Sequence, residues 1–72
     1  MNKDLEIYTQ DHCIFCLKAK EVIKNNPDMG FKVTEYDMSK HPAHRDTLKE
    51  RFPGVKTVPQ IWIGGKHIGG YD

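Results

Sequence analysis

The chain has 72 residues, of which 38% are hydrophobic and 29% are charged, and its formal net charge is +1. This balance is typical of a small globular protein and excludes a disordered one, so we expect one domain over residues 1–72. A charge so close to zero does not favour nucleic acid or an acidic membrane surface as a partner. No apolar run approaches the ~20 residues that span a bilayer, and no targeting segment follows Met1, so we expect a cytoplasmic protein.

The first half of the chain predicts a strand, a helix and a second strand. Leu5–Thr9 alternates apolar and polar residues, as a half-buried strand does. A helix is expected to begin at or just after Cys13 and to stop at Asn25-Asn26-Pro27, and residues 32–37 predict the second strand. Such a βαβ unit makes the two strands parallel, with a right-handed crossover. The helix is expected to bury Cys16, Ala19 and Ile23, with Phe15 and Val22 beside them, and to expose Lys18, Lys20, Glu21 and Lys24.

The second half predicts a helix over residues 39–52, with Pro42 in its first turn, followed by two strands. Gln60–Ile63 and residues 66–68 are the strands, and Gly64-Gly65 is the two-residue hairpin turn between them. The expected fold is therefore α/β, with a mixed four-stranded sheet and helices packed on it.

Cys13 and Cys16 are the only cysteines in the sequence. A bridge between them would close too short a loop to contribute much chain-entropy stabilisation. A cytosolic Cys-x-x-Cys pair instead favours redox chemistry or metal binding. A zinc site needs four ligands, and neither a second Cys-x-x-Cys nor a suitably paired histidine supplies the others, so no metal is expected.

Cys13 is expected at the carboxyl end of the first strand, where open α/β sheets place their sites, and at the N-terminus of a helix. Unpaired backbone N–H groups and the helix dipole favour an anion there, and the thiolate is the form that attacks a disulfide. Cys16 lies one turn further along and should be less exposed. In this interpretation Cys13 forms a mixed disulfide with the substrate, which Cys16 or an external thiol then resolves.

Two further segments have features of a binding site. In Thr57-Val58-Pro59 the proline precedes a strand, where it removes no ladder hydrogen bond, and a cis bond would turn the Val58 backbone outwards toward an extended peptide. In Gly69-Gly70-Tyr71-Asp72 the glycines permit close backbone approach, and the Asp72 carboxylate can accept hydrogen bonds from an ammonium group. The alternatives are a trans proline at a strand start and an ordinary glycine-rich turn.

Three segments together resemble the glutaredoxin family over nearly the whole chain: Cys13-Ile14-Phe15-Cys16, Thr57-Val58-Pro59-Gln60 and Gly69-Gly70-Tyr71-Asp72. The resemblance implies one glutaredoxin-like domain of thioredoxin-like βαβαββ fold, with a cis proline at Pro59. It implies an enzyme that reduces protein disulfides and glutathione mixed disulfides, with Cys13 as nucleophile and Cys16 as resolving cysteine. The residues implied to bind glutathione are Phe15, Thr57, Val58, Pro59, Gly70, Tyr71 and Asp72.

The resemblance also implies partners. Glutathione would be the co-substrate, with no tightly bound cofactor, and disulfide-containing proteins, ribonucleotide reductase among the candidates, would be the substrates. The protein is expected to act as a monomer in the cytoplasm.

The sequence departs from the family pattern in several places. Ile14 replaces the usual motif proline, and Gln10 stands where many members carry a lysine near the glutathione carboxylates. The second acid that often follows Asp72 is missing. The chain ends where the family has a further helix, so we expect that final helix to be absent and one sheet face to be less covered. The side chains that could compensate for the missing lysine are Lys18, Arg51 and Lys56.

Other functions remain open at the level of sequence. Some glutaredoxins without the motif proline hold a [2Fe–2S] cluster between two protomers, with one cysteine from each and two glutathiones as ligands, and act as cluster carriers. A glutaredoxin-like protein reduced by thioredoxin reductase would have the same cysteines, although the segment Gly69–Asp72 favours glutathione. A redox-inert binding module is disfavoured by the two suitably placed cysteines.

Overall fold

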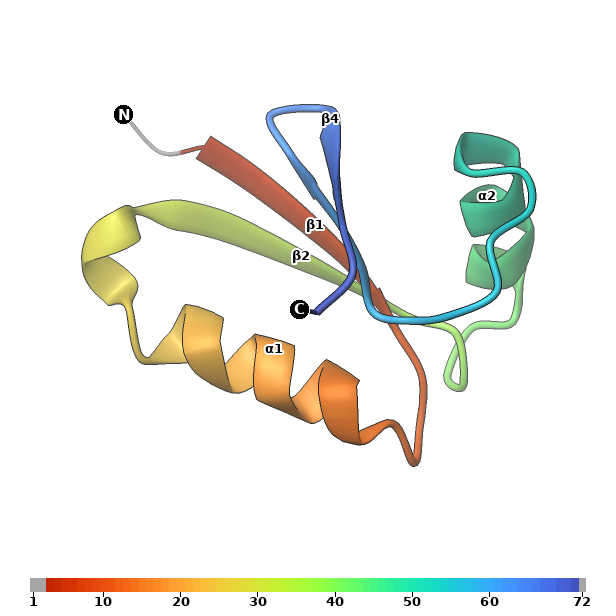
Figure 1. Ribbon diagram of the computed structural model, residues 1–72, viewed down its shortest axis with the longest axis horizontal. Coiled ribbons are helices and arrows are strands. Elements are labelled where there is room, and N and C mark those ends of the chain that lie inside the picture. Colours follow the sequence, from red (N-terminus) through yellow and green to blue (C-terminus); the bar gives the residue numbers. More distant parts are fainter. Residues whose placement is uncertain (1–2, 72) are drawn as a thin grey trace.

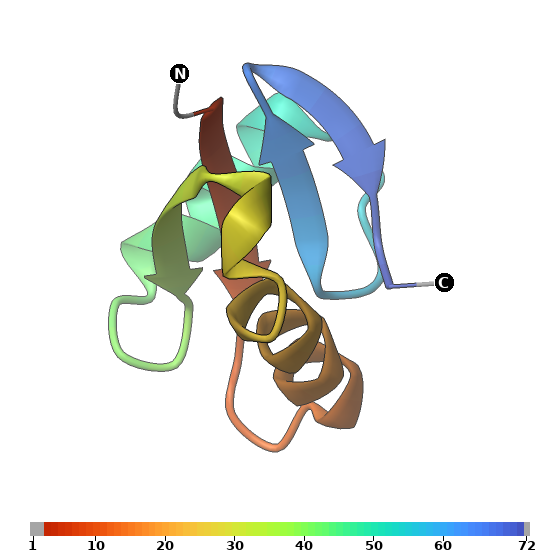
Figure 2. The same cartoon turned by 90° about the vertical axis from the view of Figure 1, so that its left-hand side faces the viewer.

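The computed structural model describes residues 3–71. A mixed sheet with the strand order β2-β1-β3-β4 lies between α1 and α2, which cover its opposite faces (Figures 1 and 2). This is the thioredoxin-like α/β fold expected from the sequence. In chain order the elements are β1 (Lys3–Thr9), α1 (Ile14–Lys24), a 3₁₀-helix η1 (Pro27–Met29), β2 (Phe31–Asp37), α2 (Ala43–Arg51), β3 (Gln60–Ile63) and β4 (Lys66–Gly69).

β1 is the central strand, and its two faces contribute to two separate apolar clusters. It pairs in parallel with β2 and antiparallel with β3. Because side chains alternate along a strand, Leu5 and Ile7 pack with Ala19 of α1, whereas Tyr8 packs on the other face with Leu48 of α2. The first cluster is completed by Ile23, Phe31, Ile61 and Ile63, and the second by Tyr36, Met38, Phe52, Val55, Val58 and Trp62.

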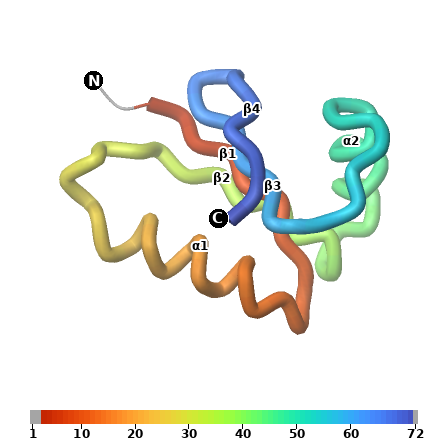
Figure 3. The backbone as a smooth tube through the Cα atoms, in the orientation of Figure 1, coloured from red at the N-terminus to blue at the C-terminus, as the bar shows by residue number. Residues whose placement is uncertain are grey.

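α1 begins and ends where the sequence predicts, and the chain then reverses through η1 into β2 (Figure 3). Cys16 and Ala19 are buried against the sheet, as expected. Phe15 and Val22, which were expected beside the buried face, are instead 51% and 49% exposed. Neither α1 nor any other helix within residues 3–71 is long and apolar enough to cross a membrane.

α2 begins at Ala43, four residues later than the pattern predicts. Proline disfavours the helical conformation at the residue before it, so His41 cannot continue a helix into Pro42. The Asp37 carboxylate also accepts hydrogen bonds from the backbone N–H groups of Ser39 (2.9 Å) and Lys40 (3.3 Å), which fixes a turn over these residues. The hairpin turn at Gly64-Gly65 is present as expected, with positive φ at both glycines.

Arg51, at the end of α2, is tied to the central strand. Its guanidinium donates to both carboxylate oxygens of Glu6 (2.9 and 3.2 Å) and to the hydroxyl of Tyr8 (3.2 Å), and it lies 4.1 Å from the centre of the Trp62 ring. The Tyr36 hydroxyl donates to the same carboxylate (2.9 Å). The hydrogen bonds from Arg51, aided by that from Tyr36, lower the pKa of Glu6 against the opposing effect of burial. This network fastens α2 to its face of the sheet.

We expect Glu6→Gln to reduce the free energy of unfolding by about 1–2 kcal/mol at neutral pH, because the charge-assisted bonds to Arg51 are lost. Since the pKa of Glu6 is lowered by folding, its contribution is present above the ordinary value of 4.5 and is lost as the pH falls through the lowered value. Urea unfolding followed by Trp62 fluorescence over a pH series measures this, with Glu50→Gln as the exposed control. A deficit equal in acid and at neutral pH would contradict it.

Candidate active site

Cys13 is the N-cap residue of α1 and lies at the meeting point of two loops. Its Sγ accepts the backbone N–H of Cys16 at 3.2 Å and lies 3.6 Å from the backbone carbonyl of Val58, to which the thiol donates. The residue is partly exposed. A partly exposed cysteine whose sulfur accepts an N–H at a helix N-terminus is placed to act as a nucleophile in its thiolate form.

Cys16 has the opposite character. It is 1% exposed, and burial together with the hydrogen bond to Cys13 raises the pKa of its thiol to about 12. A backbone hydrogen bond from Gln10 and the charge of Lys20 act in the lowering direction but do not offset burial. The sequence predicted this difference in exposure between the two cysteines. Within residues 3–71, no group of three or more His, Cys, Asp or Glu side chains is placed to hold a metal ion.

A groove of about 500 Å³ is lined by Val58, whose carbonyl contacts the Cys13 sulfur, whereas Cys13 itself does not line it. The rings of Phe15 and Tyr71 stack across it with centroids 5.9 Å apart. Six of the seven residues predicted to bind glutathione line this groove, and the seventh, Asp72, lies outside the described residues. The lining consists of Phe15, Thr57, Val58, Pro59, Gln60, Gly70 and Tyr71.

The segment of the groove lining before β3 is held by Gln60. The Val58–Pro59 peptide bond is cis, as the family resemblance implied. The buried Gln60 side chain donates to the Thr57 carbonyl (3.0 Å) and bonds to the His67 ring (2.9 Å). Sequence reasoning gave Gln60 no role, although an amide directly before an apolar strand run was a usable signal.

Gly70 lies so close to the backbone of Pro59 that a side chain would be crowded there. A Cβ atom at this position would lie 3.1 Å from the carbonyl oxygen of Pro59, tighter than an ordinary van der Waals contact. The absence of a side chain therefore lets the C-terminal segment run against the loop before β3 and close one side of the groove.

A second cavity, of about 310 Å³, adjoins the groove and shares Thr57 and Val58 with it. Gln10 lines it, at the position where a lysine was expected from the family. Three cations could compensate for the missing lysine. Lys56 lines this cavity, and the Lys18 ammonium lies 5.6 Å from the centre of the Phe15 ring. Arg51, at the end of α2, is instead paired with Glu6 of β1. Arg51 lines neither cavity, which does not favour it as the compensating cation. The remaining lining residues are Met38, Arg45, Leu48, Lys49 and Val55, so the lining combines apolar side chains with three cations.

Comparison with known proteins points to one family. The family model described as Glutaredoxin matches residues 5–68. A probable glutaredoxin of Synechocystis is 35% identical over 94% of this chain and 74% of its own length, and glutaredoxin 3 of Escherichia coli is 36% identical over 96% and 78%. The crystal structure of a buckwheat glutaredoxin–glutathione complex matches with a TM-score of 0.70 at 28% identity, over 94% of this chain and 61% of that one.

We expect the two cysteines to differ sharply in alkylation. In the folded, reduced protein, iodoacetamide should modify Cys13 at least about a hundredfold faster than Cys16 near neutral pH, because Cys16 is buried and its pKa is raised to about 12. Mass spectrometry of quenched time points measures the two rates. In guanidinium chloride both cysteines should react alike. Equal rates in the folded protein would contradict the burial of Cys16.

Proposed function

This chain belongs to the glutaredoxin family of thiol–disulfide oxidoreductases, and from that premise we propose that it is a glutathione-dependent reductase. Its substrates are protein disulfides and mixed disulfides of proteins with glutathione. The reaction takes place in the cytoplasm, where the glutathione pool keeps thiols reduced.

The groove beside Cys13 carries the proposal. It offers backbone groups of Thr57 and Val58 to the peptide backbone of glutathione, and the ring pair of Phe15 and Tyr71 to its apolar surface. Because Val58 also contacts the Cys13 sulfur, a tripeptide lying along this loop presents its own sulfur to the nucleophile. The buckwheat relative was crystallised with glutathione, which supports the same ligand here.

The chemistry follows from the positions of the two sulfurs. The Cys13 thiolate attacks a substrate disulfide, forming a mixed disulfide and releasing one substrate sulfur as a thiolate. With a protein disulfide, Cys16 then attacks the Cys13 sulfur, the internal disulfide forms, and the second substrate sulfur leaves. With a glutathione mixed disulfide, Cys13 takes the glutathionyl group, and a second glutathione removes it as glutathione disulfide without any need for Cys16.

Cations beside the groove supply a site for a glutathione carboxylate. Lys56 precedes Thr57 and lines the second cavity together with Gln10, and Arg45 and Lys49 line the same cavity from α2. Among the described residues, none of these three cations forms a salt bridge. We therefore propose that Lys56 takes over the charge pairing that the lysine of other family members provides at position 10.

The two cysteines should respond differently to substitution. We expect Cys13→Ser to abolish both reactions, because both enter through this sulfur. Cys16→Ser should lose the reduction of a protein disulfide but keep the removal of glutathione from a mixed disulfide. Each variant is measured with glutathione and glutathione reductase as the reducing system, and in parallel with thioredoxin reductase.

Two results would contradict the assignment. Activity retained by Cys13→Ser would remove this residue from the nucleophile role. Turnover of the unaltered protein with thioredoxin reductase alone would keep the cysteine chemistry and discard the glutathione site.

Charge changes at the second cavity should alter glutathione affinity. Lys56→Met is expected to raise KM for a glutathione mixed disulfide about three- to tenfold with little change in kcat, because one partly exposed charge pair is lost. Gln10→Lys should lower KM. Lys66→Met, on the exposed β4, is the matched control. Steady-state kinetics at low and high salt measure these effects, and an unchanged KM in both test variants would exclude a carboxylate site here.

A further inference from the structure

The resolving step requires an ionised Cys16, and the position of that residue opposes ionisation. Cys16 is 1% exposed, and burial raises the pKa of its thiol. This cause remains when Cys13 is bound in a mixed disulfide and carries no charge. The proposed function nevertheless needs Cys16 to attack the Cys13 mixed disulfide. A nearby charge that favours the Cys16 thiolate would therefore control how fast this step runs.

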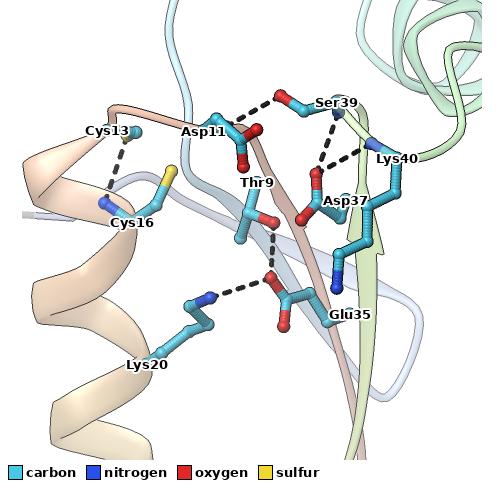
Figure 4. Close-up of polar contacts among 9 residues, drawn as sticks. All are labelled: Thr9, Asp11, Cys13, Cys16, Lys20, Glu35, Asp37, Ser39 and Lys40. Atoms are coloured by element: carbon cyan, nitrogen blue, oxygen red, sulfur yellow. Dashed lines mark hydrogen bonds and ion pairs between the residues drawn. The ribbon is translucent and has the colours of Figure 1, made fainter.

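Lys20 lies one helical turn after Cys16, on the same side of α1. Figure 4 shows both side chains extending from α1 toward the strand residues Thr9 and Glu35. The Lys20 ammonium lies 3.0 Å from a Glu35 carboxylate oxygen, and the same oxygen accepts a hydrogen bond from the Thr9 hydroxyl (2.6 Å). Thr9 is itself 1% exposed. The ammonium group is thus held against the strand residues by Glu35, although 39% of the lysine side chain remains exposed.

The charged groups around Cys16 come from two elements. On α1 they are Cys13 and Lys20, and on β2 they are Glu35 with Asp37 behind it, while β1 contributes only the neutral Thr9 and the Gln10 backbone. Lys20 is the cation of this set, and its charge acts on Cys16 in the direction that favours the thiolate. Glu35 and Thr9 keep it in that position.

We propose that Lys20, held by Glu35 and Thr9, is a positioning residue that stabilises the Cys16 thiolate for the resolving step. In this step the Cys16 thiol loses its proton to water, and the resulting thiolate attacks the Cys13 sulfur. The Cys13–Cys16 bond forms, the bond from Cys13 to the substrate sulfur breaks, and the departing thiolate takes up a proton from solvent. The proposal rests on the dithiol reaction proposed above, and it leaves the glutathione exchange at Cys13 independent of Lys20.

The test follows a single turnover, so that it does not depend on glutathione. Protein reduced with dithiothreitol and then freed of it is mixed with a disulfide-bonded peptide, quenched in acid, and analysed by mass spectrometry for the mixed disulfide and the Cys13–Cys16 disulfide. Lys20→Met should slow conversion of the mixed disulfide into the Cys13–Cys16 disulfide about three- to tenfold. It should also displace the pH–rate profile of this conversion to higher pH. The range reflects a lysine side chain that is 39% exposed, and the greater intrinsic nucleophilicity of a thiolate of higher pKa.

Two further variants make the result specific. Lys20→Arg keeps the charge and should restore most of the rate, whereas Lys24→Met removes an exposed lysine from the last turn of α1 and should leave rate and profile unchanged. Lys20→Met should also transfer a glutathionyl group to Cys13 at the unaltered rate. A resolving step with unchanged rate and pH profile in Lys20→Met would overturn the proposal, as would equal slowing by Lys20→Arg. Failure of glutathione to support turnover of the unaltered protein would instead overturn the proposed function, since the single-turnover step needs no glutathione.

Discussion

The pairing of β1 with β3 is the constraint on which the site depends. Tyr8, one residue before the end of β1, lies opposite Gln60, the first residue of β3. Because the strands are antiparallel, the loop that leaves β1 and the loop that enters β3 meet at the same edge of the sheet. Cys13 and Val58 are 45 residues apart in the chain, yet their sulfur and carbonyl oxygen lie 3.6 Å from each other. This register places the proposed nucleophile beside the loop backbone that lines the groove.

The same strand carries polar groups on both faces, and each group fastens one helix. Glu6 faces α2 and receives Arg51, whereas Thr9 faces α1 and bonds to Glu35, which in turn holds Lys20. Within residues 3–71, every buried side-chain nitrogen or oxygen has a hydrogen-bond partner. Buried polar groups are costly unless they are paired, so these networks fix where each helix lies on the sheet, in addition to the apolar contacts that hold it there.

Features determined by local sequence were predictable, and features that depend on distant partners were not. The start of α1 at Cys13 and the turn at Gly64-Gly65 follow from helix and hairpin signals, and both are present. Lys20 was expected to face outwards with the other charged residues of α1, although it lies one helical turn after the buried Cys16. Its partner, Glu35, comes from a strand whose register could not be known from the chain alone. The Gln60 amide that bonds to the Thr57 carbonyl and the Asp37 carboxylate that caps the turn before Pro42 are different cases. Their partners are close in the chain, so both were open to prediction from local sequence and were missed.

Cys13 and Cys16 are one helical turn apart, but Cys13 is partly exposed and Cys16 is buried. This difference gives the two thiols different roles in the proposed reactions. Cys13 lies at the surface, so an exchange that uses it alone responds to the groove, to the cations near Thr57 and to the ligand in solution. Cys16 lies in the interior, so a reaction that uses both sulfurs must ionise a group that burial keeps neutral. In the proposed mechanism, the two reactions are therefore governed by different parts of the molecule. We expect surface changes to alter which disulfide enters, and changes beneath α1 to alter whether the mixed disulfide is resolved internally or by an external thiol.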